Sequence, residues 1–547
     1  MPVTTFRKRY LFRAMGFELD DEHLAEQTRK MGMDVDKIGK DEFSIEFSAN
    51  RPDLIGTHGF ARALRNFMHK SSRFRYELKD DGQQLEINVG KRVSRIRPFI
   101  SALAVRNLKL DEDSLTSIIN FTDKFSETYG RKREKLAMGL HNLDAVVPPM
   151  AYDAFDDEGF VPLNKEHSMK YSEFKDRESK GIKYGHLATG RTDAYVALKD
   201  TKGTMSLIPV INSERTRVST STKNILVDIT GSLRYTVEKS ADMFAAEFMD
   251  MGGSVERVRI NYGKGSVETP AMESGIVNVP LTQMEREIGV AIGPNNVLSL
   301  AEKMGYEAAM VGRNVKFRVP EYRLDVINEQ DVEEDIAIAY GYDYIQPIVV
   351  PSIAQGSIDS ISRLTAKLRM IMLGFGFSEL VSTYLTSEQV NFGFARLDDK
   401  GDYIKIGNPK TTTATMLRTW LVPGLLSSLG KSVHERMPQK LFETDMVFRI
   451  ENGKTIEEYD LAAAITDSKA NFNDIKAIFE SLLKMAPLVY KIEEMEHRSF
   501  IEGRCAKATM NGVTIGYFGE VHPEVLGNFG IEEPTVAFEL RLSDVLL

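Results

Sequence analysis

The sequence predicts an α+β protein of several domains, because segments of alternating polarity and segments of helical periodicity follow one another along the chain. The chain has 547 residues, and at about 150 residues per domain it should hold three or four domains. Hydrophobic residues make up 42% and charged residues 27%, which is typical of folded globular proteins and not of disordered chains. The predicted domains cover residues 1–85, 86–262, 268–347 and 352–547.

In the first two predicted domains, strands and helices alternate with polar turns. The turn at 50–53 separates the first strand from the first helix, and residues 139–231 are rich in Gly, Pro, Asp and Thr, as in a mixed α and β domain. The predicted strands cover residues 43–47, 99–105, 205–211 and 225–229. The predicted helices cover residues 56–68, 115–129 and 237–251. A glycine pair ends the last helix, and we expect residues 261–266 to form a linker.

The third predicted domain is small, with helices and a strand, and the fourth opens with a helix and continues with short strands. The short strands of the fourth predicted domain indicate a sheet. The elements predicted in these two domains are helices over 281–288, 294–304, 329–340 and 360–373 and a strand over 314–319.

Composition excludes several classes of protein. The single cysteine, Cys505, excludes an intramolecular disulfide and a thiolate zinc cluster, and it favours a reducing, cytoplasmic location. The first ten residues do not resemble a signal peptide, and no apolar run is long enough to span a bilayer, so we expect no membrane association. The net charge of -9 argues against a surface that binds a polyanion throughout. A local basic patch remains, formed by Arg131, Lys132, Arg133 and Lys135, for which a solvated loop is the alternative.

Carboxylates are crowded in and before the helix over 329–340. At about 100° per residue, this helix places Asp331, Glu334 and Asp335 on one face. The apolar face consists of Val332, Ile336 and Ala339. A loop can return Asp325 to the acidic face, which would assemble oxygen ligands of the kind that Mg²⁺ prefers. Alternatively, the acids stabilise the N-terminus of the helix, with Asn328 as the N-cap. Spacing alone favours the stabilisation of the helix N-terminus over metal binding.

The same segment resembles a family signature. Tyr322 to Val326, followed by Asp331 to Ala337 and Tyr340 to Tyr342, is similar to the signature of phenylalanyl-tRNA synthetase beta subunits of the archaeal and eukaryotic-cytosolic form. Further resemblances follow in the family's order over nearly the whole chain. They cover residues 50–54 with Gly59, Ala61 and Arg62, then 139–144, 209–214, 227–231, 408–409, 417–426, 442–443 and 519–526.

This resemblance implies a division of labour between two subunits. An alpha subunit would carry the site that joins phenylalanine to tRNA(Phe) with ATP, in a heterotetramer of two alpha and two beta chains. The last domain would be a class II synthetase-like sheet without catalytic motifs, because residues 516–520 end in an acid where an arginine is expected, and Arg418 would be structural. The resemblance also assigns Mg²⁺ to four acids and so favours metal binding over capping alone: Asp325, Asp331, Glu334 and Asp335.

The resemblance further implies that this chain edits Tyr-tRNA(Phe). A largely apolar pocket rejects an isostere with one added hydroxyl only about a hundredfold, so a second site that binds the hydroxyl is needed. Asn212, Ser213 and Glu214 supply donors and acceptors for a phenol. His141, which by itself indicates a structural histidine, becomes a candidate for binding substrate or orienting water. No Ser-His-Asp set can be inferred, which favours direct attack by water. The basic patch would contact the tRNA backbone.

Two other functions are compatible with these observations. The chain could be a stand-alone metal-dependent hydrolase of mischarged tRNA, or a non-catalytic RNA-binding scaffold. The synthetase-like last domain favours the subunit, because a free hydrolase does not need it. An apolar patch on that domain is expected only of the subunit.

Overall fold

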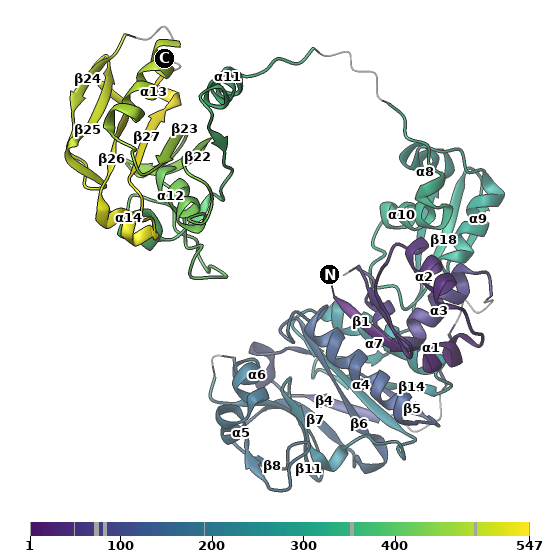
Figure 1. The fold of residues 1–547 in the computed structure, drawn as a ribbon. Coiled ribbons are helices and arrows are strands. Elements are labelled where there is room, and N and C mark those ends of the chain that lie inside the picture. The colour runs from purple at the N-terminus through teal and green to yellow at the C-terminus, as the bar shows by residue number, and fades with distance from the viewer. Residues whose placement is uncertain are drawn as a thin grey trace. The chain divides into compact units, whose positions relative to one another are not determined.

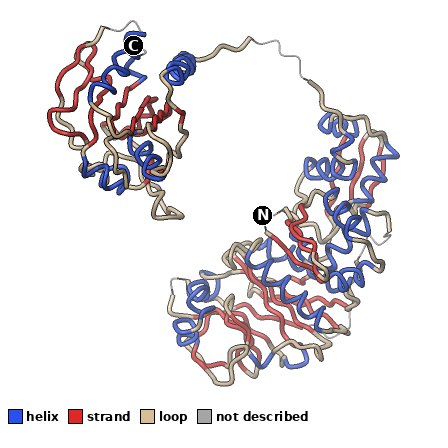
Figure 2. Tube along the Cα trace, viewed as in Figure 1, coloured by secondary structure: helices blue, strands red, loops and turns tan. Residues whose placement is uncertain are grey.

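The structure is a computed structural model that describes residues 2–48, 50–70, 76–79, 85–190, 192–349, 355–485 and 489–545. The chain divides into two compact units, Met1–Val349 and Val350–Leu547 (Figure 1). Helices and strands occur throughout both units (Figure 2), which confirms the predicted mixed α and β multidomain class. The first predicted domain boundary, between residues 85 and 86, falls at the start of β4 (Leu85–Val89).

The first unit begins with a small antiparallel sheet of order β1-β3-β2, covered by helices. Its strands are β1 (Val3–Arg7), β2 (Asp34–Ile38) and β3 (Glu42–Glu46), and its helices are α1 (Lys8–Met15), α2 (Asp21–Lys30) and α3 (Thr57–Phe67). The 3-10 turn η1 (Pro52–Ile55) leads into α3, as the sequence predicts. Phe60 of α3 is fully buried and stacks on Phe6 of β1, with ring centroids 4.9 Å apart, so the helix packs directly on the sheet.

A ten-stranded sheet forms the centre of this unit, and along its main path the order is β12-β11-β10-β7-β4-β14-β5-β13-β6. The strands on that path are β12 (Ile211–Asn212), β11 (Gly203–Leu207), β10 (Tyr195–Asp200), β7 (Met150–Phe155), β4 (Leu85–Val89), β14 (Ser254–Asn261), β5 (Phe99–Arg106), β13 (Ile225–Gly231) and β6 (Leu136–Asn142). β15 (Ser266–Thr269) pairs with β14 in an antiparallel hairpin. Residues 262–265 are therefore the connection of a hairpin, and the expectation of a linker there is wrong.

Long helices pack against this sheet. α7 (Arg234–Asp250) lies against β5 and β13, and α4 (Glu112–Glu127) lies against β6 (Figure 1). Asp111 caps α4 by accepting from the backbone N–H of Ser114, at 2.9 Å. Two shorter helices, α5 (Tyr171–Arg177) and α6 (Ser179–Thr189), pack on each other, and α6 contacts β10. These helices were not predicted individually.

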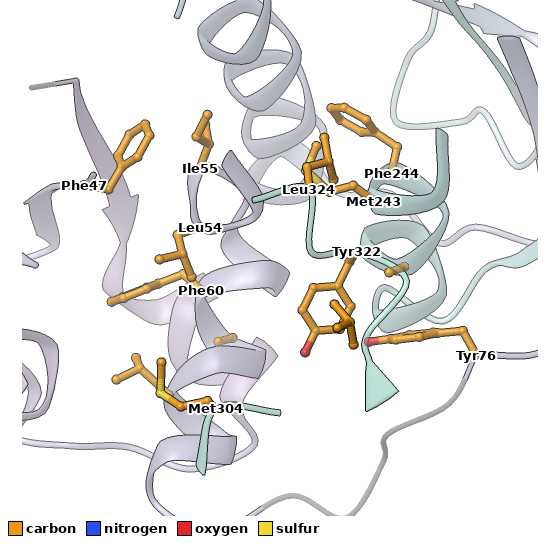
Figure 3. Packing of buried hydrophobic residues seen from close by; sticks show 14 of the residues in the cluster. Phe47, Leu54, Ile55, Phe60, Tyr76, Met243, Phe244, Met304, Tyr322 and Leu324 are labelled. Atoms are coloured by element: carbon orange, nitrogen blue, oxygen red, sulfur yellow. The ribbon is translucent and has the colours of Figure 1, made fainter. Parts of the chain in front are cut away.

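A third sheet, of order β16-β18-β17, carries three helices at the end of the first unit. The strands are β16 (Gly275–Pro280), β17 (Glu307–Val311) and β18 (Asn314–Val319), and the helices are α8 (Leu281–Ile288), α9 (Pro294–Lys303) and α10 (Glu329–Tyr340). One apolar core runs from this sheet into α3 and α7. Figure 3 shows Tyr322 and Leu324 between the helix that carries Phe60 and the helix that carries Met243 and Phe244. The segment before α10 is thus part of a shared core.

The second unit is built on a seven-stranded sheet of order β19-β22-β23-β27-β26-β25-β24, antiparallel except for the β19–β22 pair. Its strands are β19 (Ser378–Glu379), β22 (Gln439–Glu451), β23 (Lys454–Thr466), β24 (Lys491–Glu494), β25 (Phe500–Met510), β26 (Val513–Val521) and β27 (Thr535–Arg541). The helices are α11 (Ser360–Gly374), α12 (Val422–Lys431), α13 (Phe472–Met485) and α14 (Pro523–Phe529). β19 and β24 are short, as the sequence predicts, whereas β22 and β23 have 13 residues each and are longer than expected.

Within the part of the chain that the structure describes, no helix has both the length and the apolar character that crossing a membrane requires.

Candidate functional site

A cavity of the first unit lies where the two edges of the large sheet approach each other. β12 and β6 are at opposite ends of the strand order, yet the side-chain amide of Asn212 on β12 donates to the backbone carbonyl of Leu140 on β6, at 2.9 Å. The cavity encloses about 330 Å³ between these edges, α4 and the turn at residues 208–210. This volume is at the lower end of the range of ligand pockets, about 300–1,000 Å³.

Two buried polar side chains line this cavity. Ser206 is 2% exposed, and among the described residues its Oγ has no hydrogen-bond partner. Asp228 on β13 is also 2% exposed. A Cβ on Gly139 would lie 2.6 Å from Asp228 Oδ1 and 3.1 Å from Asn212 Oδ1, so only glycine leaves this part of the cavity open. A buried hydroxyl without a partner costs free energy, which a polar ligand would recover.

His141 lies behind the cavity wall. Its side chain is fully buried, and its Nε2 lies 2.9 Å from Asp228 Oδ1. Because a carboxylate only accepts, Nε2 donates this bond, and Nδ1 is paired with the Thr216 hydroxyl at 2.8 Å. His141 thus has no free nitrogen for a ligand, and its contacts fix the orientation of Asp228.

The other two predicted editing residues organise the rim. Ser213 is buried, donates to the Val161 carbonyl at 3.1 Å and caps the short turn that follows. Both Glu214 oxygens accept from Arg217, at 2.6 and 2.9 Å, and Oε2 also accepts from the Asn164 backbone, at 2.8 Å. These hydrogen bonds, the largest from Arg217, lower the pKa of the Glu214 carboxyl. Arg217 and Asn164 line the cavity, whereas Glu214 supports them from outside.

The basic patch divides into side chains with different surroundings. Arg131 and Lys132 are exposed on a turn where both residues have positive φ. Arg133 lines the cavity, where its Nη1 donates to the carbonyls of Pro209 and Val210, each at 3.1 Å. Lys135 is half-buried over the Tyr129 ring, and burial, with a contribution from Arg131, lowers the pKa of its amine.

A buried arginine anchors this patch to the sheet. Arg97 is 3% exposed and donates to the hydroxyl and carbonyl of Thr230 on β13, at 2.9 and 2.6 Å. It also donates to the Arg133 carbonyl at 3.0 Å. Burial lowers the pKa of Arg97 to about 10, so its charge remains at neutral pH. The turn that carries the exposed cations is therefore held at a fixed position beside the cavity.

The four acids predicted to bind Mg²⁺ do not converge. Asp325 accepts two hydrogen bonds from Arg323, at 2.8 and 2.7 Å. Asp335 accepts from the Tyr306 hydroxyl at 2.5 Å and pairs with the same arginine at 2.7 Å. Although burial opposes it, Arg323 holds the pKa of the Asp325 carboxyl below its ordinary value. Both carboxylates therefore bind the same buried guanidinium.

The remaining two acids lie at the surface. Asp331 accepts from the backbone N–H groups of Ile327 and Asn328, at 2.7 and 2.9 Å, and forms a capping box with Asn328. The capping interpretation is thus confirmed. Glu334 is exposed whereas Asp335 is 4% exposed, so the predicted common acidic face is wrong. Among the described residues, no three His, Cys, Asp or Glu side chains are placed to hold a metal ion. As arranged here, these four acids do not fit Mg²⁺.

Two residues of the cavity, Ser206 and Asp228, are not among the site residues that the sequence predicts. Ser206 is the only hydroxyl within the apolar run from Met205 to Ile211, and a polar residue in such a run was the available signal. For Asp228, an acid within a fully buried strand was a comparable signal. Neither pattern reveals a cavity, because the cavity depends on the approach of two distant sheet edges.

Family models match three parts of the chain. Three family models match, described as the Phe-tRNA synthetase beta subunit B1 domain (residues 1–70), the tRNA synthetase B5 domain (residues 277–342) and the phenylalanyl tRNA synthetase beta chain CLM domain (residues 347–542). These three matches leave residues 71–276 uncovered, where the cavity lies.

Similar full-length proteins and a solved structure complete the comparison. The chain is 34% identical to the phenylalanine–tRNA ligase beta subunit of Methanocaldococcus jannaschii, over 99% of this chain and 100% of that protein. It is also 34% identical to that of Thermococcus kodakarensis, over 99% of each. An N-terminal fragment of the Pyrococcus horikoshii phenylalanyl-tRNA synthetase beta subunit aligns with a TM-score of 0.60 and 30% identity, over 62% of this chain and 100% of the fragment. The chain therefore belongs to the family of phenylalanyl-tRNA synthetase beta subunits, and it is part of an aminoacyl-tRNA synthetase.

Proposed function

We propose that this chain edits for the synthetase by hydrolysing Tyr-tRNA(Phe) in the cavity between β6 and β12, while an alpha subunit performs the synthesis. The unpartnered Ser206 hydroxyl carries this proposal, because it is buried in the wall of a cavity of suitable size. A phenol can both donate and accept, which suits a cavity lined by a hydroxyl and a carboxylate. A site built to bind a hydroxyl rejects the analogue without it by about 10⁴ to 10⁵.

Asp228 and Ser206 supply the polar contacts to the substrate in this mechanism. The tyrosyl hydroxyl donates to Asp228 and accepts from Ser206, while a phenylalanyl group would leave both unsatisfied. Asn212 joins the two sheet edges and thereby keeps the cavity at a fixed width. His141 is a positioning residue, since it reaches substrate only through Asp228.

Water is the nucleophile in this proposal. Ser206 is not activated by a histidine, because both nitrogens of His141 are used by Thr216 and Asp228. The ester would enter past Arg217 and Asn164, which Glu214 holds at the rim. We assign the exposed Arg131 and Lys132 to the phosphates of the acceptor strand, and Arg133 and Lys135 to the support of that turn.

The second unit supports assembly with the alpha subunit and not catalysis. Arg418 is 4% exposed and donates to Glu443 at 2.5 Å, so it is not free to bind a nucleotide phosphate. Glu520 accepts from the Phe472 backbone at 2.8 Å and pairs with Arg504 at 2.5 Å. We infer that this sheet is a class II synthetase-like domain without catalytic motifs, and that ATP and its Mg²⁺ are used on the alpha subunit.

An exposed apolar surface on α11 supports this assembly. Met370 and Leu373 are 69% and 48% exposed, and they are three residues apart on one side of the helix. Ile358, just before α11, is 67% exposed. Exposed apolar side chains on one helix face are typical of a protein interface. We propose that alpha binds here, in a cytoplasmic heterotetramer of two alpha and two beta chains.

The experiment is deacylation of preformed Tyr-tRNA(Phe) by the chain alone and by the alpha-beta complex, with wild type compared with Ser206→Ala. Loss of at least tenfold in the variant, with phenylalanylation unchanged, is the expected result. Hydrolysis by the chain alone at the rate of the complex would favour a stand-alone hydrolase. No hydrolysis in either preparation would reduce the chain to an RNA-binding scaffold and refute editing here.

A further inference from the structure

A cluster of buried charges fixes the segment before α10 against α10 and Tyr306. Arg323 is at its centre, with a side chain only 1% exposed. It binds Asp325 through two parallel hydrogen bonds and Asp335 through a third contact at 2.7 Å. The ring of Tyr306 lies 5.5 Å from the guanidinium carbon, and its hydroxyl donates to Asp335. Every member of this cluster except the guanidinium is an anion or a hydroxyl.

We propose that Arg323 is the cation of this acidic segment, and that the segment is an arginine-centred brace between domains and not a divalent metal site. This inference concerns the architecture of the chain and is independent of editing. It follows from the contacts of the carboxylates themselves, because both oxygens of Asp325 and Oδ2 of Asp335 are already used by donors.

A second arginine makes the position unfavourable for an additional cation. Arg51 binds Asp53 through two hydrogen bonds, at 2.9 and 2.8 Å, and its charge interacts with both Arg323 and Asp325. A dication at the carboxylates would therefore face two guanidiniums at close range. Like charges that share a partly desolvated site repel each other strongly. Mg²⁺ also requires near-octahedral coordination. These carboxylates do not provide it, because their oxygens already accept hydrogen bonds from protein donors.

The brace has a clear structural task. Arg323 lies between Tyr322 and Leu324, and these two residues pack between α3 and α7 (Figure 3). Tyr322 lies under the guanidinium of Arg62 at 3.8 Å, and Arg62 in turn pairs with Asp250 of α7. Fixing Arg323 therefore fixes the two apolar side chains that join the third sheet to the rest of the unit. Planar, bidentate arginine suits this purpose better than lysine.

The test uses the full chain and Mn²⁺ as the probe, with bound ion counted by electron paramagnetic resonance in wild type and Glu334→Gln. Glu334 is exposed, so this variant should fold. The proposal predicts equal Mn²⁺ binding in both proteins and the same unfolding midpoint in EDTA as in Mg²⁺. It also predicts that Arg323→Met lowers the midpoint of the first unit by at least about 5 °C. The matched control is Arg286→Met, whose side chain is 75% exposed, and it should leave the midpoint unchanged.

Three results would overturn the proposal. The first is one saturable Mn²⁺ per chain that Glu334→Gln abolishes. The second is a midpoint that falls in EDTA and recovers with Mg²⁺. The third is an Arg323→Met protein as stable as wild type. If Arg323→Met does not fold, the Mn²⁺ comparison between wild type and Glu334→Gln still decides the question.

Discussion

Replacing Asp228 by Asn tests how the cavity recognises a tyrosyl group. The substitution keeps the shape of the side chain, and the amide oxygen can still accept from His141, whose Nε2 lies 2.9 Å from Oδ1 in the wild type. What changes is the charge presented to the phenol. The second carboxylate oxygen becomes an amide that donates, so it repels the hydroxyl proton that the substrate would offer.

The magnitude follows from the kind of hydrogen bond that is lost. A hydrogen bond to a charged group is worth about 1.5–3 kcal/mol when the site is buried. Asp228 is 2% exposed, so little solvent screening reduces this value. Since about 1.4 kcal/mol corresponds to a factor of ten, kcat/KM for deacylation of Tyr-tRNA(Phe) should fall about 10- to 150-fold.

The assay is single-turnover deacylation of Tyr-tRNA(Phe) by the alpha-beta complex, with phenylalanylation measured in parallel. Asp144→Asn is the matched control, because Asp144 is an exposed carboxylate of the same sheet domain that pairs with Asn224 outside the cavity. The control should deacylate normally. If Asp228→Asn hydrolyses Tyr-tRNA(Phe) as fast as the control, Asp228 does not bind the phenol and the proposed mechanism is refuted.

Three further predictions concern the basic turn, a buried histidine and α11. Arg131→Ala should weaken tRNA binding and reduce the slope of log K against log[salt] by about 0.7–0.9 per lost phosphate contact. Arg133→Ala should instead slow deacylation without changing that slope, because its guanidinium holds the cavity wall. Equal slopes in both variants would contradict this. Burial lowers the pKa of His58 to about 4. Below about pH 6.5 the unfolded chain therefore binds a proton that the folded chain does not. The free energy of unfolding should fall by up to roughly 3 kcal/mol between pH 6.5 and 4. His58→Asn should flatten this dependence in denaturant titrations, and an unchanged slope would show that other groups cause it. Leu373→Asp should prevent co-purification with the alpha subunit, because it places a charge in the proposed interface, while a complex that forms normally would exclude this face.

Much of the secondary structure is predictable from the sequence. The helices over 281–288 and 329–340 have the predicted bounds, because their apolar periodicity and capping residues are encoded within a dozen positions. The segment 261–266 was misinterpreted, because a Gly-Lys-Gly stretch is as typical of a hairpin turn as of a linker. The length of β22 and β23 was underestimated, since polar residues on one face of a long strand resemble interruptions.

Residue pairing was much harder to predict. Arg323 stands two positions before Asp325 and twelve before Asp335, and nothing in the spacing indicates that both acids turn towards it and not towards a metal. The cavity presents the same difficulty. Asn212 and Leu140 are 72 positions apart in the chain, and they meet only because the sheet brings its two edges together. Sequence patterns indicate which residues are polar or apolar. The partners of buried polar groups, however, depend on contacts between residues that are far apart in the chain.

The rates at which the wild-type alpha-beta complex deacylates Tyr-tRNA(Phe) and Phe-tRNA(Phe) test the central claim most directly. Both esters should be supplied preformed on the same tRNA, under identical conditions and without ATP, so that synthesis does not interfere. A cavity in which Ser206 and Asp228 bind the phenol predicts hydrolysis of the tyrosyl ester at least about a hundredfold faster, because the phenylalanyl ester leaves the polar groups of the cavity without this partner. Equal rates for the two esters would contradict the account, because the cavity would then not distinguish the hydroxyl.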